Sequence, residues 1–521
     1  MKSRLGMLLV VLALTVGTAS AQDARSLLQA ADRAMGASAV KSVQYSGTGW
    51  MATPGQSYAA DGDWPRADLK SYMNTIDYDS KSAKEELVRV QGNNQPRGGG
   101  GQPIQGEQRV ANFVSGNYAW NLNQQNQPNP QPAAAEVRQF MLWVSPHGFV
   151  KAGIESGNAT LADRHFAVQG RTMKVVGFTA MGKYRVTGEF NDQNLLERVV
   201  TWIPNPVMGD MQVEIRYSDY RDIGGGAKFP FRIHAHQGDH PLLPVSTGRN
   251  WMDVRVSDAK ANVANAALTV PDNVRSASAP QMRVTAERLG NGVWLMGGGS
   301  HNSVAVEFRD FITVIEGPLD DARSNAVIAE VKKTIPNKPI RYLVNTHHHF
   351  DHLGGVRTFV AEGATVVTHD RNRELYERVI FAPQVRALTP DRLALFPFAT
   401  TGPGPLPLDT FPDRYSISDG QRTVLVHHVQ GLNHNENMLI VYLPQERIVI
   451  NADLWSPPAQ GAAPPANISQ SAISLYNNIR RLKLDVAQHV PIHGTPGPHA
   501  DFERMVGPAA AAARPAGEGG G

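Results

Sequence analysis

The run His347-His348-His349-Phe350-Asp351-His352 places four histidines and one carboxylate within six residues. The preceding segment 342–345 is typical of a strand, and the following residues 353–355 open a helical pattern. The run is therefore predicted on a loop at the carboxyl end of a strand, where open α/β sheets usually place their sites. The first and third histidines alternate along the chain and can point to one side, while the aspartate and last histidine can face a second position. One short loop can thus supply two neighbouring metal pockets.

Nitrogen and oxygen are the only strong ligand atoms that this chain offers to such a site. It contains no cysteine, so thiolate ligands and disulfide bonds are both excluded. A pattern of the form H-x-H-x-D-H should arise by chance on the order of once per thousand chains of this length. The alternative that these are ordinary surface histidines therefore carries little weight.

Three further polar residues follow apolar strands later in the chain. His434 comes after the strand-like segment 424–429, Asp453 follows a predicted hairpin over 438–451, and His493 follows 490–492. Each is expected at the same sheet edge as the first run. The sequence therefore predicts one clustered site that is assembled from several strand ends.

The content and order of these motifs resemble the metallo-β-lactamase superfamily of metal-dependent hydrolases, over about residues 283–505. The resemblance implies an αββα sandwich with its site at one edge. It also implies two metal sites joined by a carboxylate: His347, His349 and His434 for the first metal, Asp351, His352 and His493 for the second, and Asp453 as the bridge.

This ligand set favours zinc. Three histidines leave one tetrahedral position open, as catalytic zinc sites require. A water shared by two cations can have its pKa lowered towards about 7, so a metal-bound hydroxide is the expected nucleophile. Asp351 is the expected catalytic residue, because it can also orient that water. Two zinc ions per chain are expected, and zinc is preferred over iron because His349 stands where the di-iron branch of the resembled superfamily has glutamate. Iron or manganese stays possible, since the ligands alone do not select the metal.

Other polar residues near the predicted site are expected to have structural roles. Glu316, at another strand end, is a candidate partner for a ligand rather than a ligand itself. The aromatic residues of 371–411 and the Pro/Ala-rich stretch 454–468 suggest covering segments and a partly apolar small-molecule substrate. The remaining histidines near the site are interpreted as packing residues: His301, His348, His369, His427 and His428.

The substrate stays open, with an ester, lactone or thioester as the main candidates. β-Lactamase activity is disfavoured, because cysteine is absent, Asp453 supplies a bridging carboxylate, and Ser456 stands where one lactamase branch carries lysine. Two other classes remain as alternatives. One is a mononuclear iron oxidoreductase resembling the sulfur dioxygenases, and the other is a carrier protein with a structural metal.

The first half of the chain predicts a separate β-rich α+β domain over 22–276. A helix is expected over 23–35, followed by many short strands separated by turn residues. The Gly-rich stretch 96–101 and the Gln/Asn/Pro tract 124–132 are interpreted as exposed, mobile hairpin tips. The layout loosely resembles the half-barrel of periplasmic lipoprotein carriers, which implies that this domain can hold an acyl group or a partner protein.

The chain ends predict export and a disordered tail. Lys2 and Arg4 precede the apolar run 5–16 and an A-x-A site, so residues 1–21 are expected to be a signal peptide and the protein to be periplasmic or secreted. No later segment is long and apolar enough to span a membrane. A net charge of +3 over 521 residues, without basic clusters, excludes a nucleic-acid-binding surface. The Ala/Pro/Gly-rich residues 507–521 are expected to be disordered.

Overall fold

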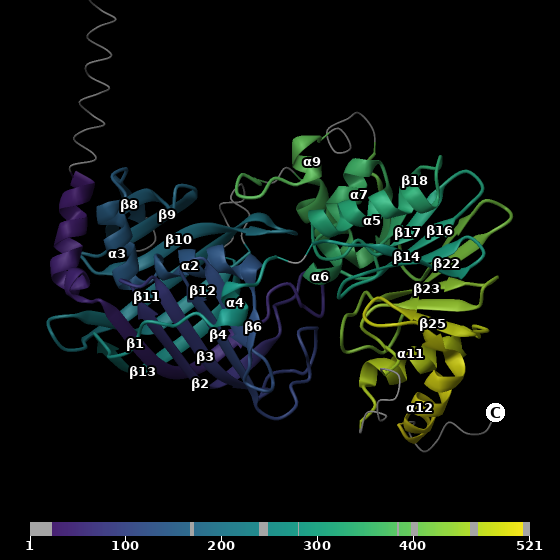
Figure 1. Cartoon of the computed structure of the whole chain (residues 1–521), viewed down its shortest axis with the longest axis horizontal. Helices are drawn as coiled ribbons and strands as arrows, with labels where there is room; N and C mark the ends of the chain where they lie inside the picture. Colours follow the sequence, from purple (N-terminus) through teal and green to yellow (C-terminus); the bar gives the residue numbers. More distant parts are fainter. Residues whose placement is uncertain are drawn as a thin grey trace, which may run out of the picture.

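A computed structural model of the chain describes residues 23–166, 171–238, 248–279, 281–382, 385–397, 405–458 and 467–513. The expected signal peptide lies outside these residues. Two domains lie side by side, and loops of the first reach towards the second (Figure 1). Among the described residues, none of the helices combines the length and apolar character that crossing a membrane would require.

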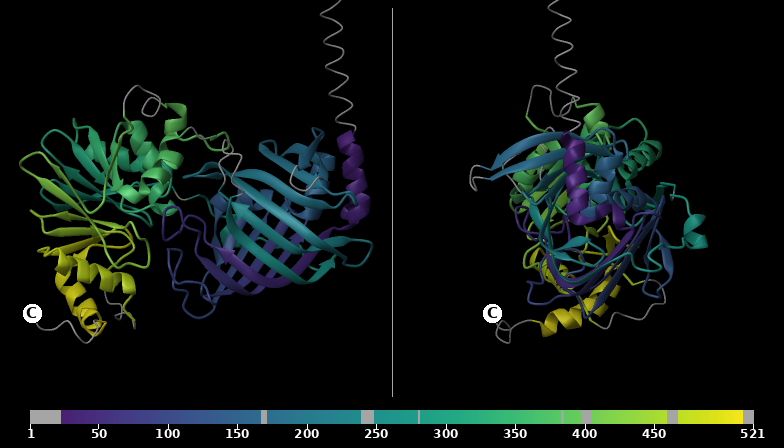
Figure 2. Two further views of the ribbon diagram at one scale, coloured as in Figure 1. Left: turned by 180° about the vertical axis from the view of Figure 1, so that it is seen from behind. Right: turned by 90° about the vertical axis from the view of Figure 1, so that its left-hand side faces the viewer.

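The N-terminal domain is built on one antiparallel sheet of thirteen strands, in the order β6-β5-β4-β3-β2-β1-β13-β12-β11-β10-β9-β8-β7. The sheet is curved, and α2 and α3 pack against one of its faces (Figure 2). Its strands are β1 (Ser42–Ala52), β2 (Arg66–Asp77), β3 (Ser82–Val90), β4 (Gln108–Ser115), β5 (Tyr118–Leu122), β6 (Pro128–Pro130), β7 (Thr160–Phe166), β8 (Arg171–Ala180), β9 (Tyr184–Phe190), β10 (Leu196–Asn205), β11 (Gly209–Asp222), β12 (Lys228–Gln237) and β13 (Arg249–Ala261). Its helical segments are 23–35, η1 (Ala37–Ala39), η2 (Pro132–Ala134), α2 (Ala135–Leu142), α3 (Pro146–Glu155) and α4 (Asp272–Arg275).

The N-terminal helix has the predicted bounds, 23–35, and it ends at Gly36. This glycine has a φ of 67°, in the left-handed region where a side chain is disfavoured. A Cβ at this position would also lie 2.7 Å from the carbonyl oxygen of Gly226. The helix therefore ends where the chain needs a glycine to turn against the sheet.

The C-terminal domain has four layers, with a helical layer outside each of two sheets (Figure 1). The first sheet contains β14 (Thr285–Gly290), β15 (Val293–Gly297), β16 (Ser303–Glu307), β17 (Ile312–Ile315), β18 (Ile340–Val344), β19 (Thr365–His369) and β20 (Leu408–Phe411). The second contains β21 (Arg414–Ser418), β22 (Thr423–His428), β23 (Leu439–Leu443), β24 (Ile448–Asn451), β25 (Gln488–Pro491) and β26 (Gly497–Pro498). The helical segments are α5 (Asp321–Thr334), α6 (Phe350–Leu353), α7 (Val356–Glu362), η3 (Asp370–Asn372), α8 (Arg373–Tyr376), η4 (Glu377–Phe381), α9 (Arg392–Leu395), α11 (Gln470–Arg481) and α12 (His499–Ala512).

Three apolar cores hold these four layers together. One lies between the first sheet and α5 with α7, another between the two sheets, and the third between the second sheet and α11 with α12. Strands β17 to β20 are parallel, and β17 is buried along its whole length because both faces of the sheet are covered there. The architecture confirms the predicted αββα sandwich preceded by a β-rich domain.

Of the two loops predicted as exposed hairpin tips, the Gln/Asn/Pro tract has an exposed turn at residues 124–127, as expected, whereas the Gly-rich stretch is partly buried. Gly98 and Gly99 are buried, and the N–H of Gly98 donates to the carbonyl oxygen of Asn433 at 2.9 Å, across the domain boundary. The prediction was therefore wrong for the Gly-rich stretch, because glycine there allows close backbone contact rather than mobility. Within the second tract, β6 (Pro128–Pro130) forms the edge strand of the sheet, a position that tolerates proline.

Other contacts also join the domains, and the end of the chain is more ordered than predicted. The described part of the 371–411 insertion contacts the β10–β11 turn: Asp210 accepts hydrogen bonds from the backbone N–H groups of Ala387 and Leu388 at 3.0 and 3.1 Å. Helix α12 continues through residues 507–512, where a disordered tail was expected, so that expectation is wrong for those residues. Val506 and Ala510 are buried against the second sheet, which explains the order. Residues 514–521 lie outside the described part of the chain.

Candidate metal centre

The predicted histidine run begins on the loop after β18, as the sequence indicated, but its last three residues, Phe350, Asp351 and His352, already belong to α6, so the helix begins earlier than predicted. Two side chains fix its path. Asn345 donates to the carbonyl oxygen of His352 at 2.9 Å, and the backbone N–H of Thr346 donates to Glu316 at 2.6 Å. All four residues in these two hydrogen bonds are buried, so the loop is held in one conformation.

All seven predicted ligands come together in two adjacent groups, although their roles as ligands stay a prediction. Within each group, the candidate donor atoms lie within 4.8 Å of one another. The first group corresponds to the predicted first site plus the bridging carboxylate, and the second to the predicted second site plus one further histidine. The groups are His347, His349, His434 and Asp453, and then His301, Asp351, His352 and His493.

The carboxylate of Asp453 lies between the two groups. Its Oδ2 is 3.0 Å from His434 Nε2 and 3.1 Å from His352 Nε2, and its Oδ1 is 2.8 Å from His493 Nε2. Asp453 follows β24 in a left-handed conformation with a φ of 59°, which is uncommon for a residue other than glycine. The backbone is thus strained at the point where it turns this carboxylate towards both groups, as is common at functional sites.

Sequence reasoning missed His301, which it interpreted as a packing residue. Its Nε2 lies 3.4 Å from Asp351 Oδ2, and its ring centroid is 4.0 Å from that of His493. The available signal was its position between two strands, β15 and β16, like the strand-end positions of the predicted ligands. The other histidines interpreted as packing residues, among them His348, lie outside both groups.

The donor set fits a metal, because two buried nitrogen atoms face the cluster without a hydrogen-bond partner. These are His347 Nε2, which lies 3.2 Å from Asp453 Oδ2 without a hydrogen bond to it, and His349 Nδ1; both side chains are fully buried. Their opposite ring nitrogens do have partners: His347 Nδ1 lies 3.0 Å from Thr346 Oγ1, and His349 Nε2 lies 3.0 Å from the carbonyl oxygen of Ser57. A buried polar atom without a partner is costly, and a cation would satisfy both atoms at once.

The protonation states of the predicted histidine ligands follow from their burial and from the carboxylates that lie close to them. Burial lowers the pKa of His347 to about 4, and that of His349 falls well below its usual range for the same reason. Both rings are therefore neutral at neutral pH, as metal ligands must be. Burial also disfavours the charged form of His352, but Asp453 and Glu316 outweigh this effect and raise its pKa. Glu316 accepts from His352 Nδ1 at 3.0 Å, which agrees with its predicted role as partner to a ligand.

Residues 296–495 match the family model described as the metallo-beta-lactamase superfamily. The C-terminal domain belongs to this superfamily. The predicted superfamily, one of metal-dependent hydrolases, is thereby confirmed for this domain. The metallo-β-lactamase domain occupies less than half of the chain.

One curated relative is a linear primary-alkylsulfatase from Pseudomonas sp., 26% identical over 223 residues. The match spans 37% of this chain and 41% of the relative's own length. Among solved structures, a metallo-beta-lactamase from Pontibacter korlensis matches with 17% identity and a TM-score of 0.32, over 44% of this chain and 100% of that one. Another, from Hirschia baltica, matches with 22% identity and a TM-score of 0.31, over 43% of this chain and 96% of that one.

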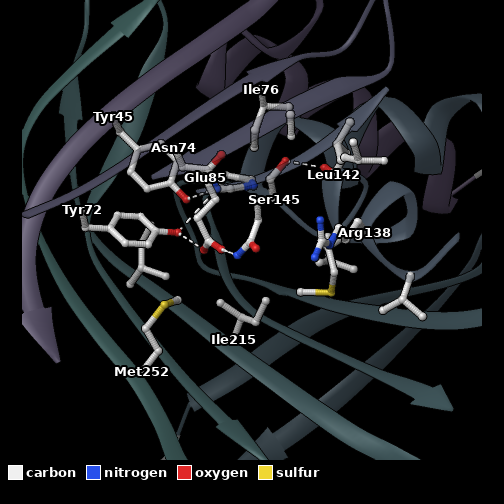
Figure 3. A pocket seen from close by; sticks show the side chains of 18 of the residues that line it. Tyr45, Tyr72, Asn74, Ile76, Glu85, Arg138, Leu142, Ser145, Ile215 and Met252 are labelled. Atoms are coloured by element: carbon white, nitrogen blue, oxygen red, sulfur yellow. Dashed lines mark hydrogen bonds between the residues drawn. The ribbon is translucent and has the colours of Figure 1, made fainter. Parts of the chain in front are cut away.

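A second candidate site lies inside the N-terminal domain, between the curved sheet and α2. It is a cavity of about 370 Å³ whose wall is mostly apolar, with Met51, Ile76 and Met252 among its lining residues. A small polar network lies on one side, where Glu85 accepts hydrogen bonds from Tyr72 and Asn112, each at 2.9 Å (Figure 3). Another polar atom of the lining, Asn74 Oδ1, is buried and has no hydrogen-bond partner.

Proposed function

We propose that this protein is an exported dinuclear zinc hydrolase that cleaves an ester, lactone, thioester or related bond in a small molecule. One observation carries the proposal: two buried, unpartnered imidazole nitrogens face a cluster in which a single carboxylate, Asp453, contacts histidines of both groups. A structural site normally holds one metal with four ligands of its own, whereas here Asp453 lies between two adjacent groups and contacts both. Export is supported by the charged and apolar pattern of the first residues.

The chemistry divides between the metal ions and the chain's own groups. Zinc held by this set would polarise the scissile bond and activate water at neutral pH. Asp351 orients the attacking water and accepts its proton. This carboxylate is suited to the task because its side chain is 36% exposed, so water and substrate can reach it, whereas His347, His349 and His352 are buried.

The surroundings of Asp453 support a partly apolar substrate. A cavity of about 450 Å³ adjoins it, lined by apolar side chains such as Leu454 and Ile468 and by polar ones such as Asn467. A volume of this size accommodates a small organic molecule. The name of the alkylsulfatase relative adds alkyl sulfate esters to the substrates worth testing.

β-Lactam hydrolysis receives less support as the main activity. The hydroxyl of Ser456, which stands where one lactamase branch carries lysine, already donates to the carbonyl oxygen of His493. No lysine stands in its place, and the chain has no cysteine for a thiolate site. The alternative, a mononuclear iron site, would use only part of this ligand set. The residues of the second group would then have no metal to bind.

Metal analysis with a substrate panel tests the proposal. Protein purified from the periplasmic fraction should begin at Gln22 and contain two zinc ions per chain. The zinc-loaded protein should hydrolyse at least one chromogenic ester, lactone, thioester or alkyl sulfate faster than a β-lactam. Chelation should remove this activity, and added zinc should restore it.

Three outcomes would contradict the proposal. One iron ion per chain would favour an oxidoreductase. A β-lactam as the best substrate would favour the activity that names the fold. Retained activity after complete removal of metal would exclude metal-dependent hydrolysis altogether.

We propose also that the N-terminal cavity binds an aliphatic chain whose head group donates a hydrogen bond. Apolar walls favour a chain of methylene groups, and the unpartnered Asn74 Oδ1 can accept from a hydroxyl or an amine. Burial raises the pKa of Tyr45 to about 12, so its hydroxyl stays neutral and adds no charge to the lining.

Quenching of tryptophan fluorescence by 12-bromododecan-1-ol tests this proposal, because Trp251 lines the cavity. The brominated alcohol should quench the full-length protein saturably. Ala83→Phe places a larger side chain in the cavity and should weaken binding at least about tenfold. Ala111→Phe, on the same sheet but not among the lining residues, should not. Equal binding by both variants would contradict the proposed site.

A further inference from the structure

We propose that the N-terminal domain completes the metal centre, with Gln56 as a positioning residue for Asp351. The inference rests on the proposed metal-dependent function and extends it to a residue outside the metallo-β-lactamase domain. Gln56 is 295 positions before Asp351 in the chain, on the segment between β1 and β2. The catalytic unit is then formed by both domains together.

Gln56 holds one oxygen of the predicted catalytic carboxylate. Its Nε2 donates to Asp351 Oδ1 at 2.8 Å. The other oxygen, Oδ2, faces the cluster, at 3.4 Å from His301 Nε2 and 3.7 Å from His352 Nε2. A hydrogen bond to an ionised carboxylate is short and directional, so the amide fixes which oxygen faces the cluster.

The backbone on both sides of Gln56 is attached to the loops that carry the predicted ligands. The carbonyl oxygen of Gly55 accepts from the N–H of Phe350 at 3.1 Å, and that of Tyr58 accepts from the N–H of Glu436 at 3.0 Å. The carbonyl oxygen of Ser57 lies 3.0 Å from His349 Nε2. Residues 55–58 thus form a continuous contact with the metal centre, and Gln56 has little freedom to move away from it.

The carbonyl oxygen of Ser57 also sets the orientation of one predicted ligand. An acceptor at that position requires the proton of neutral His349 to sit on Nε2. The Nδ1 atom is then left unprotonated and directed at the cluster, where it has no other partner. This is the arrangement by which partners of a ligand fix its tautomer at metal sites.

The Gly-rich loop packs directly against Gln56. The N–H of Gly99 donates to the carbonyl oxygen of Gln56 at 3.0 Å. A Cβ on Gly99 would lie 1.9 Å from Gln56 Oε1 and 2.7 Å from His349 Cε1, both impossibly close. Only glycine fits here, so the loop leaves Gln56 no alternative position on that side. This loop therefore acts as a support for the site.

The experiment measures the dissociation constants of both zinc ions by competition with a chromophoric chelator, in the full-length protein. Gln56→Met keeps the size of the side chain and removes the donor. It should weaken one of the two zinc constants at least about tenfold and leave the other within about twofold. Gly99→Ala should weaken both constants, because its methyl group displaces Gln56 and also lies against His349 of the first group. The cobalt-loaded forms of both variants should show a shifted visible absorption spectrum, which reports the ligand geometry.

Two control variants separate positioning from general damage. Gln193→Ala removes an exposed glutamine in the same domain, and Gly177→Ala adds a methyl group where its nearest neighbour is 3.6 Å away. Both should keep wild-type constants and spectra.

Two results would overturn the inference while leaving the proposed function intact: wild-type constants in Gln56→Met, or an equal loss at both zinc ions in that variant. Failure of the wild-type protein to bind two zinc ions would instead overturn the proposed function, and this inference with it.

Discussion

Replacement of Asp351 by asparagine is expected to lower kcat/KM by about 10³-fold for whichever substrate the panel identifies. Asparagine keeps the shape of the side chain but loses the negative charge that orients the water and accepts its proton. The carboxylate is half-exposed, and its main contacts are Gln56 and His301 rather than core residues. The fold should therefore survive, which circular dichroism and thermal melting would check.

The matched control for this variant is Asp310→Asn. Its side chain is 68% exposed, pairs with neighbouring Arg309 and belongs to neither group of candidate ligands. Its kcat/KM should stay within about twofold of wild type. If Asp351→Asn kept activity within about tenfold of the wild-type value, the role assigned to this carboxylate would be wrong.

Replacement of Arg323 by methionine is expected to lower the free energy of unfolding by about 3 kcal/mol or more. Arg323 is fully buried in α5, and its guanidinium donates to backbone carbonyl oxygens instead of a carboxylate. The acceptors include Met296 at 3.0 Å and His301 at 2.9 Å. Methionine fills similar volume but leaves these buried carbonyl oxygens without a donor, and their desolvation is then uncompensated.

Urea unfolding measures this loss, with Arg504→Met as the control. The Arg504 side chain is 68% exposed and pairs only with a nearby aspartate in α12, so its loss should change stability by less than about 1 kcal/mol. If the urea midpoint of Arg323→Met equalled that of the control variant, the buried guanidinium would contribute nothing to the free energy of unfolding. Because Arg323 also holds the loop of His301, the variant should bind the second zinc ion more weakly.

Most of the site was predictable from the sequence because its residues stand at strand ends. A strand of four to six apolar residues can be recognised by its pattern, and the carboxyl ends of neighbouring strands meet at one edge. His434, Asp453 and His493 could therefore be grouped with the histidine loop without coordinates. His301 was not predicted as a ligand. A single histidine in a Gly-Ser loop is far more often a packing residue than a metal ligand, and no spacing to other histidines distinguished it.

The Gly-rich stretch 96–101 shows why a prediction from composition alone was wrong. Consecutive glycines are typical of flexible linkers, and the pattern around 96–101 carries no sign of a partner. In the folded chain the missing side chains allow the backbone to approach Asn433 and His349. Mobility and close packing both favour glycine, so its presence does not discriminate between them.

The sequence by itself indicated alternating strands and helices with polar residues at strand ends, since these depend on local patterns, and the resemblance of those motifs to the superfamily implied the αββα domain and the candidate ligands. Only the tertiary structure decided that Gln56, Ser57 and Gly99 of the first domain reach the cluster. They contact it across some 250 to 295 positions of chain, and no repeat or spacing encodes a contact of that range. Such contacts form when two separately folded surfaces meet, so they are properties of the packed domains rather than of any segment.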